Sequence, residues 1–317
     1  MILYLVIPCY NEEEVLHETS SRLLIKFNGF INTGKIDSKS RIVFVNDGSK
    51  DKTWEIIEEL HNSNSLFSGI NLSRNKGHQN ALMAGLMTVR EECDAVISMD
   101  ADLQDDINAI DSMIDKFENG FDVVYGVRSS RKKDSFFKRS TAQCFYKFMK
   151  AMGVDIIYNH ADYRLMSKRA LEGLSEFNEV NLFLRGIVPL IGYKSTTVLY
   201  ERGERFAGES KYPLKKMLAF AFEGITSLSV KPIRMITSLG CTVFGVSLII
   251  LIYSLIRHLT GHTVDGWTSL AGSIWALGGI QLLAIGIIGE YIGKIYLETK
   301  HRPKYIVADY LHEKNKD

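Results

Sequence analysis

Four aspartates lie within a stretch of seven residues that directly follows an apolar run. Carboxylates this close together repel one another and favour protonation unless a cation lies between them. Asp100 and Asp102 are two residues apart, and Gln104 adds a neutral oxygen. Because oxygen donors suit Mg²⁺ or Mn²⁺, we predict that these three side chains bind one divalent metal ion. For Asp105 and Asp106 we predict only a helix-capping role.

Such a metal ion needs a substrate that carries phosphates. Magnesium usually keeps coordination positions for substrate phosphate oxygens. The sequence contains no Walker-type Gly-Lys-Ser loop, so ATP hydrolysis is not indicated. A metal that bridges phosphates without this loop favours a nucleoside diphosphate as leaving group, and we therefore predict a sugar nucleotide as substrate.

Short apolar runs alternate with stretches of helical periodicity through the N-terminal half of the chain. This rhythm predicts an α/β fold, with a mostly parallel sheet that is covered by helices on both faces. The predicted strands are 2–7, 41–46, 68–72, 95–99, 122–127 and 195–200, and the predicted helices are 12–27, 53–61, 79–89, 107–118 and 136–152. Segment 28–40 is predicted to be a mobile insertion.

Polar residues follow the carboxyl end of each of the first five strands, in segments 8–13, 46–51, 73–77, 98–106 and 126–128. Any one segment is weak evidence, because Asn-Asp-Gly-Ser is typical of turns and Asp51 could cap a helix. Their arrival at one edge of the sheet predicts a ligand site there. The basic patch 131–133 would offset phosphate charge or, equally well, attract anionic lipid headgroups.

Two long runs without charge occur near the C-terminus, at 235–256 and 267–289. Each is long enough to cross a bilayer, which needs roughly 20 apolar residues, and the pair predicts a helical hairpin in a membrane. Lysines and arginines flank the outer ends of the hairpin, whereas the loop between the runs has only Arg257. This asymmetry predicts cytoplasmic termini and a cytoplasmic catalytic domain in a multi-pass inner (plasma) membrane protein. The amphipathic stretch 213–228 is predicted to lie in the lipid interface.

Composition sets broad limits on the protein. A chain of 317 residues with 46% hydrophobic residues can bury a large core, and its formal net charge of +1 says little about partners. The four cysteines have no paired spacing, so neither a disulfide framework nor a zinc site is predicted, and a reducing compartment fits. The N-terminus lacks the basic start of a signal peptide, and we predict none.

Several motifs in this chain form a recognisable set. They are Pro8-Cys-Tyr-Asn-Glu12, Asp47-Gly-Ser49, Asp100-Ala-Asp102-Leu-Gln104, Asp162-Tyr-Arg164, the stretch 205–212, Gly278-Gly-Ile-Gln281, the stretch 286–293 and Arg302-Pro-Lys-Tyr305. The set resembles the family 2 glycosyltransferases that act on polyprenyl phosphates, and the last three motifs narrow it to the bactoprenol glucosyltransferase branch. The resemblance covers nearly the whole chain and implies a GT-A type fold.

The resemblance implies roles for the residues at matching positions. The implied nucleotide-binding residues are Pro8, Tyr10, Asn11, Glu12, Val45, Asp47, Lys76, Asp100, Ala101 and Asp102, the metal ligands are Asp100, Asp102 and Gln104, and the phosphate or acceptor residues are Arg128, Arg205 and Lys211. Asp162 matches the catalytic base of the family. A phosphate monoester has a second pKa of about 6, so its attacking oxygen is largely deprotonated at neutral pH. Three roles for Asp162 therefore stay open at this point: catalytic base, orientation of the acceptor, and an ion pair with Arg164.

The implied reaction is transfer of glucose from UDP-glucose to undecaprenyl phosphate, with inversion at the anomeric carbon. No residue pattern identifies the hexose, so N-acetylglucosamine, aminoarabinose and mannose are alternatives, as is a non-catalytic glycolipid-binding scaffold or flippase subunit. The expected regions are a catalytic domain (1–212), an interfacial helix (213–232), a membrane hairpin (233–292) and a tail (293–317). The expected partners are a UDP-sugar, a polyprenyl phosphate and membrane lipid, without nucleic acid, and the resemblance suggests a homo-tetramer.

Overall fold

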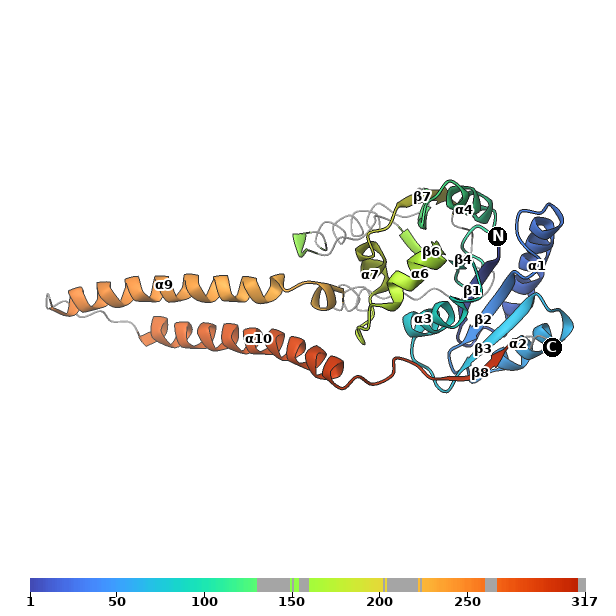
Figure 1. Ribbon diagram of the computed structural model, residues 1–317. Coiled ribbons are helices and arrows are strands. Elements are labelled where there is room, and N and C mark those ends of the chain that lie inside the picture. Colours follow the sequence, from blue (N-terminus) through green and yellow to red (C-terminus); the bar gives the residue numbers. More distant parts are fainter. Residues whose placement is uncertain are drawn as a thin grey trace.

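The protein consists of a sheet domain from which two long helices extend side by side (Figure 1). The computed structural model describes residues 1–129, 149, 151–153, 160–201, 203, 222, 224–259 and 267–312. The predicted helices at 136–152 and 213–228 lie mostly outside the described residues. Within the second of them, residues 224–228 are helical.

The sheet has eight strands in the order β7-β5-β6-β4-β1-β2-β3-β8. Their bounds are β1 Leu3–Cys9, β2 Arg41–Asn46, β3 Phe67–Leu72, β4 Ala95–Ser98, β5 Val123–Arg128, β6 His160–Ser167, β7 Ser195–Tyr200 and β8 Val307–Leu311. Strands β4, β1, β2 and β3 are parallel neighbours, and β7 is parallel to β5. Strand β6 runs antiparallel between β4 and β5, and β8 is antiparallel at the β3 edge. The prediction of a mostly parallel α/β sheet is confirmed.

Helices cover both faces of this sheet. Their bounds are α1 Leu16–Asn32, α2 Thr53–Ser63, α3 His78–Val89, α4 Ala109–Glu118, α6 Lys168–Ser175 and α7 Leu184–Leu190. Apolar side chains of α1, α2 and α4 pack in one buried cluster, and those of α3, α6 and α7 pack in a second cluster on the other face. In α1 and α4 apolar residues recur at helical spacing, so each helix buries one stripe against the sheet, whereas α3 is buried continuously from Ala81 to Leu86.

Segment 28–40 is not the mobile insertion that we predicted. Helix α1 continues to Asn32, and Phe30 and Ile36 are buried in the core. The Ser40 hydroxyl is also buried and accepts a hydrogen bond from the backbone N–H of Leu3. The prediction was wrong because this mostly polar segment contains two apolar residues, Phe30 and Ile36, that pack in the core.

Strands β6 and β8 were not predicted. Both are antiparallel, and each pairs with a strand that is distant in sequence: β6 with β4, and β8 with β3. Neither strand belongs to the alternating rhythm of strands and helices that predicted the others. Pairing over such long sequence separations leaves no local signal in the chain.

The C-terminal helices are α9 (Lys231–Leu259) and α10 (Trp267–Thr299), and each contains one of the predicted charge-free runs. Among the described residues, Leu277–Thr299 is long and apolar enough to cross a membrane, and none of its most apolar window is buried. Large apolar side chains such as Leu282 and Leu283 are exposed along α10. A helix with this exposure is not a core helix of the sheet domain.

Candidate active site

A pocket of about 320 Å³ opens at the carboxyl edge of the sheet, where the sequence predicts a ligand site. It is lined by Pro8, Tyr10, Glu12, Asp47, Asn75, Gly77, His78 and Ala81. The pocket therefore lies between the loops that follow β1, β2 and β3, at the start of α3. Four of its lining residues, Pro8, Tyr10, Glu12 and Asp47, are predicted nucleotide-binding residues.

Asp47 fixes the entrance to α3. Its carboxylate accepts hydrogen bonds from the backbone N–H groups of Lys76 at 2.7 Å and Gly77 at 2.9 Å. Gly77 has a φ of 85°, a conformation that glycine adopts without strain. Burial raises the pKa of Asp47, although the two backbone N–H groups act against this shift. The carboxylate thus holds the loop before α3 against the end of β2.

The loop after β1 is tied to the loop after β2. The backbone N–H of Asn11 donates to the Ser49 hydroxyl at 3.0 Å, and the Asn11 side-chain oxygen accepts from Lys50 N–H at 2.9 Å. Asn11 has a φ of 55°, which asparagine tolerates better than most residues. The backbone N–H of Glu12 donates to Thr53 at the start of α2. These bonds make the two loops one rigid wall of the pocket.

Six predicted nucleotide-binding residues lie outside the pocket lining: Asn11, described above, Asp100 and Asp102, described below, and Val45, Lys76 and Ala101. Val45 has no exposed surface and packs beside Gly85 of α3, so it supports the pocket from within the core. Ala101 is also in the core, where its carbonyl oxygen accepts a hydrogen bond from Thr19. Lys76 contributes its backbone to Asp47, while its ammonium lies 3.5 Å from the Pro303 carbonyl oxygen.

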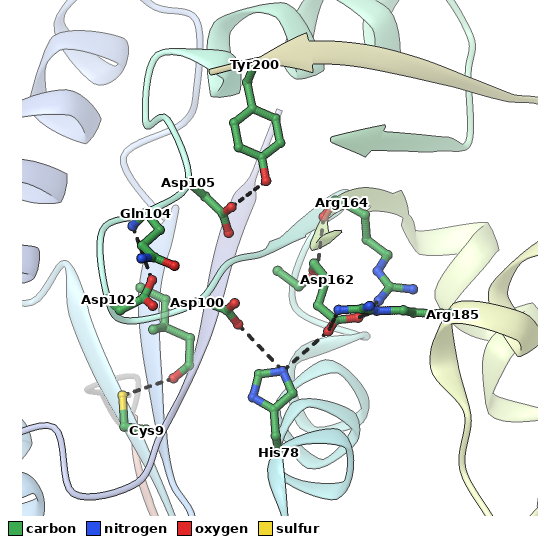
Figure 2. Close-up of polar contacts among 12 residues, drawn as sticks. Cys9, His78, Asp100, Asp102, Gln104, Asp105, Asp162, Arg164, Arg185 and Tyr200 are labelled. Atoms are coloured by element: carbon green, nitrogen blue, oxygen red, sulfur yellow. Dashed lines mark hydrogen bonds and ion pairs between the residues drawn. The ribbon is translucent and has the colours of Figure 1, made fainter. Parts of the chain in front are cut away.

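The aspartate loop follows β4 and gathers the predicted metal ligands (Figure 2). The backbone N–H of Gln104 donates to Asp102 at 3.2 Å, and Leu103 between them has a φ of 56°. Burial raises the pKa of Asp100, and the nearby carboxylates of Asp162 and Asp102 raise it further, while His78 acts to lower it. The loop therefore presents closely spaced carboxylates, as the sequence predicts.

These side chains fit a magnesium or manganese ion by their chemistry. Within the described residues, no group of three or more His, Cys, Asp and Glu side chains is placed to hold a metal ion. Magnesium is usually bound by one or two carboxylates together with substrate phosphates, however, and does not need a cage of protein ligands. Asp100 and Asp102 supply two carboxylates, and Gln104 supplies an amide oxygen. This donor set suits a site that is completed by a diphosphate.

Asp162 lies beside the aspartate loop because β6 pairs with β4. The register places Arg164 opposite Ser98, and the Ser98 hydroxyl donates to the Asp162 carbonyl oxygen at 2.5 Å. His78 lies between the two acids, with its Nε2 atom 3.6 Å from Asp100 and 3.8 Å from Asp162 (Figure 2). The start of α3, the end of β4 and the start of β6 therefore meet at one point.

Two arginines hold the Asp162 carboxylate. Arg164 Nη2 donates to Oδ1 at 2.7 Å, and Arg185 donates to Oδ2 from Nη2 at 3.0 Å and to Oδ1 from Nε at 3.3 Å. Burial acts to raise the pKa of Asp162, but the charges of Arg185 and Arg164 outweigh it and keep the pKa well below its usual range. A carboxylate with such a low pKa and with both oxygens engaged is a weak proton acceptor.

Sequence reasoning missed Arg185 and His78. Arg185 lies on the short helix α7, in a stretch without any motif that we could interpret. His78 directly follows the predicted polar segment 73–77, and the glycine before it marks a helix start. That glycine was the one available signal for His78, since a residue at a helix N-terminus beside the sheet edge faces the ligand site.

Asp105 is not the helix cap that we predicted. It is buried and accepts a hydrogen bond from the Tyr200 hydroxyl, which lies 3.4 Å from Arg128 Nε. Burial and the neighbouring Asp100 raise its pKa to about 6. Asp106 is not the cap of α4 either: its carboxylate accepts from the backbone N–H of Asn108 in the turn before the helix, and the N-cap position itself is Asn108. Arg128 therefore lies near the aspartate loop and is supported by a buried tyrosine.

The remaining predicted basic residues cannot be placed. Arg205 and Lys211 lie outside the described residues, as does the basic patch 131–133. The positive charge that the structure does describe near the aspartate loop comes from Arg128, Arg164 and Arg185.

Comparisons with known proteins agree with this geometry. The profile of glycosyl transferase family 2 matches residues 4–175, and the profile of the GtrB C-terminal hairpin matches residues 231–295. The uncharacterized glycosyltransferase YkoT of Bacillus subtilis is 55% identical over 306 residues, which cover 96% of this chain and 91% of that protein. The bactoprenol glucosyl transferase of Shigella phage SfV is 41% identical over 311 residues, which cover 98% of this chain and 99% of that protein.

A more distant likeness is to a solved structure. The crystal structure of glucosyl-3-phosphoglycerate synthase from Mycobacterium tuberculosis, in complex with Mn²⁺, UDP-glucose and phosphoglyceric acid, aligns with a TM-score of 0.43 and 15% identity. The alignment covers 72% of this chain and 78% of that chain. At this level of similarity the likeness supports no conclusion about substrate.

Proposed function

This chain belongs to glycosyl transferase family 2, and we propose that it transfers glucose from UDP-glucose to undecaprenyl phosphate or a related polyprenyl phosphate. The observation that carries the proposal is the 41% identity to bactoprenol glucosyl transferase, which extends over nearly the full length of both chains. The match includes the C-terminal hairpin as well as the catalytic domain. The product would be a polyprenyl-phosphate sugar that serves as a donor in cell-envelope glycosylation.

The donor nucleotide is proposed to bind in the pocket at the start of α3. Pro8, Tyr10, Glu12 and Asp47 are among the residues that line this pocket. Tyr10 is 44% exposed, so its ring is available to a base or ribose. The N-terminus of α3 lies beside the pocket, where its backbone N–H groups favour an anion such as a diphosphate.

The aspartate loop is proposed to receive the diphosphate. A divalent ion, when bound by Asp100, Asp102 and Gln104, would offset the negative charge that develops on the departing UDP. Arg128 lies close enough to the loop to support the same charge, and Arg205 and Lys211 are further candidates from the family resemblance. The cations are needed because two anionic substrates must approach each other.

The transfer itself requires no proton acceptor. A lone pair on the acceptor phosphate oxygen attacks the anomeric carbon, a new C–O bond forms, and the bond from that carbon to the UDP oxygen breaks with its electron pair leaving on UDP. The attacking oxygen is already largely deprotonated above a pH of about 6. We therefore propose that Asp162 orients the acceptor side of the site and does not act as a base, because two arginines already occupy its oxygens.

The two C-terminal helices are proposed to cross the inner (plasma) membrane as a hairpin. The support is the exposed apolar segment Leu277–Thr299 in α10 and the charge-free run 235–256 in α9. The flanking lysines and arginines favour cytoplasmic termini and a cytoplasmic catalytic domain. Such an anchor would keep the enzyme beside an acceptor whose phosphate lies in the headgroup plane. A homo-tetramer is proposed from the family resemblance alone.

The test is a transfer assay with the purified full-length protein in detergent. Undecaprenyl phosphate is supplied with labelled UDP-glucose, UDP-N-acetylglucosamine, UDP-aminoarabinose or GDP-mannose, with and without EDTA. We expect labelled lipid with UDP-glucose, loss of the product with EDTA, and recovery on addition of Mg²⁺ or Mn²⁺. Labelled lipid from another donor alone would change the assigned sugar, and no labelled lipid from any donor would refute the function.

A further inference from the structure

Arg185 has a partly exposed guanidinium group beside the site, and the proposed transfer step does not involve it. It lies in the first turn of α7, and its side chain is 32% exposed. It meets the Asp162 carboxylate side-on through Nη2 and Nε, at 3.0 Å and 3.3 Å. This grip fixes the plane of the guanidinium while part of it still faces solvent.

Arg185 is the more accessible of the two arginines that hold Asp162. Asp162 is one carboxylate facing two guanidinium groups, and Arg164 is buried with only 2% of its side chain exposed. Arg164 is also committed to the Leu184 carbonyl oxygen at 3.4 Å. Of the two guanidinium groups, only that of Arg185 is exposed enough for a ligand from solvent to reach. Asp100, across His78, belongs to the aspartate loop that is proposed to face the diphosphate.

The position of Arg185 points toward the lipid substrate. The loop before α7 is fastened to the end of α10, where the Glu298 carboxylate accepts hydrogen bonds from Val180 N–H at 2.8 Å and Asn181 N–H at 2.9 Å. The start of α7 is also fastened to α3, because Leu184 N–H donates to Gln79 at 2.8 Å. Arg185 therefore lies between the nucleotide pocket at α3 and the helix proposed to leave the membrane.

We propose that Arg185 binds the phosphate of the polyprenyl phosphate acceptor, and that Asp162 is the positioning residue that holds its guanidinium in place. A guanidinium matches phosphate oxygens through two parallel N–H donors, which a lysine ammonium cannot reproduce. The inference rests on the proposed function, since it names the residue that receives the second substrate. It also gives Asp162 a role that agrees with its engaged oxygens.

The experiment compares Arg185→Gln and Arg185→Lys with wild type in full-length protein. KM for undecaprenyl phosphate and KM for UDP-glucose are measured separately, and the Kd of UDP with Mn²⁺ is measured by calorimetry. We expect Arg185→Gln to raise the acceptor KM by about tenfold or more, because a charge-assisted phosphate contact is lost. The donor KM and the Kd of UDP should stay within about twofold of wild type, and Arg185→Lys should fall between.

A matched control is Arg169→Gln. Arg169 pairs with Asp122 at the opposite edge of the sheet, so this variant also removes an arginine from an arginine–aspartate pair. It should leave both KM values unchanged. Binding of UDP reports whether Arg185→Gln is folded, since the pocket at α3 does not contain Arg185.

The outcomes separate the inference from the function on which it rests. An unchanged acceptor KM in Arg185→Gln, with wild type active, would overturn the role of Arg185 and leave the function standing. A rise in the donor KM equal to the rise in the acceptor KM would also overturn it. A wild-type protein that transfers no sugar would instead refute the function itself.

Discussion

The proposed donor side of the site is built from residues at or just after the carboxyl ends of parallel strands, whereas the proposed acceptor side comes from an antiparallel strand and a short helix. The proposed donor side comprises Pro8 near the end of β1 and, after β1, β2 and β4, Tyr10, Glu12, Asp47, Asp100 and Asp102. The acceptor side comprises Asp162 and Arg164 on β6 and Arg185 on α7. Both sides meet at His78, which lies near an aspartate of each.

The two sides hold their carboxylates by different means. Asp47 and Asp102 on the donor side accept hydrogen bonds from backbone N–H groups of nearby loops. Asp162 on the acceptor side is held by side chains of arginines, one of which is 23 residues away in sequence. Backbone donors are fixed by the loop itself, whereas an ion pair depends on the packing of separate elements. The donor side should therefore tolerate changes in distant packing better than the acceptor side.

The largest expected effect is that of Asp102→Ala on the donor side. Turnover should fall by about 100-fold or more, because the charge on the departing diphosphate loses its main offset. Initial rates at increasing Mn²⁺ concentrations measure the change. Asp106→Ala is the control, since Asp106 holds only the turn before α4, and it should keep near-normal turnover. Equal rates in the two variants would contradict the metal role of Asp102.

On the acceptor side, Asp162→Asn should lower kcat/KM for the acceptor by about 50-fold through misplacement of Arg185. It should also destabilise the protein by about 3 kcal/mol at neutral pH, because the buried Arg164 loses its counter-charge. Chemical unfolding of both proteins measures the loss. The exposed pair of Glu18 and Arg22 provides a control, since Glu18→Gln should change stability by less than about 1 kcal/mol.

The acid dependence of this difference has a definite sign. The pKa of Asp162 is lower in the folded protein than the value of about 3.9 in an unfolded chain. Its stabilising contribution is therefore fully present above that unfolded value and is lost as the pH falls through the folded pKa. The stability gap between wild type and Asp162→Asn should narrow only below a pH of about 4. A gap that already closes near pH 6 would contradict the tight pairing with the two arginines.

Asp47→Asn tests the donor side with a smaller effect. The asparagine keeps one acceptor oxygen but turns an amide N–H₂ toward one of the two backbone donors before α3. The Kd of UDP should rise by about tenfold, corresponding to one lost buried hydrogen bond, and the acceptor KM should stay near its wild-type value. Calorimetry with UDP and steady-state kinetics provide the two values. An equal rise in the Kd of UDP and in the acceptor KM would contradict the assignment of Asp47 to the donor side alone.

Glu298→Gln should have the smallest effect and should act on the acceptor side. Glutamine keeps a hydrogen-bond acceptor for the loop before α7 but loses the negative charge that strengthens the contacts to Val180 and Asn181. The acceptor KM should rise by about threefold while the Kd of UDP stays unchanged. Glu290→Gln on the same helix is the control. A larger change in the Kd of UDP than in the acceptor KM would show that α10 supports the donor side, which would contradict this prediction.

The same contrast explains what the sequence could predict. Donor-side positions could be found because a buried parallel strand delivers its last residues to a known edge of the sheet, as Asp100 and Asp102 illustrate. Arg185 could not be found, since its partner Asp162 lies on an antiparallel strand inserted between β4 and β5. Asp105 was misjudged because proximity to a helix start favours a cap, whereas the partner Tyr200 comes from a distant edge strand.

The two C-terminal helices lie in the chain between the strands at the two margins of the sheet. The strand that precedes the hairpin, β7, and the strand that follows it, β8, form the two opposite margins of the sheet. In sequence, helices α9 and α10 therefore lie between the two outermost strands of the sheet. Glu298 at the end of α10 is also bonded to the loop before α7, so the helices are attached to the domain at a further point. In the proposed membrane arrangement these attachments would keep the reaction centre near one height above the bilayer, and the long isoprenoid chain would supply the mobility.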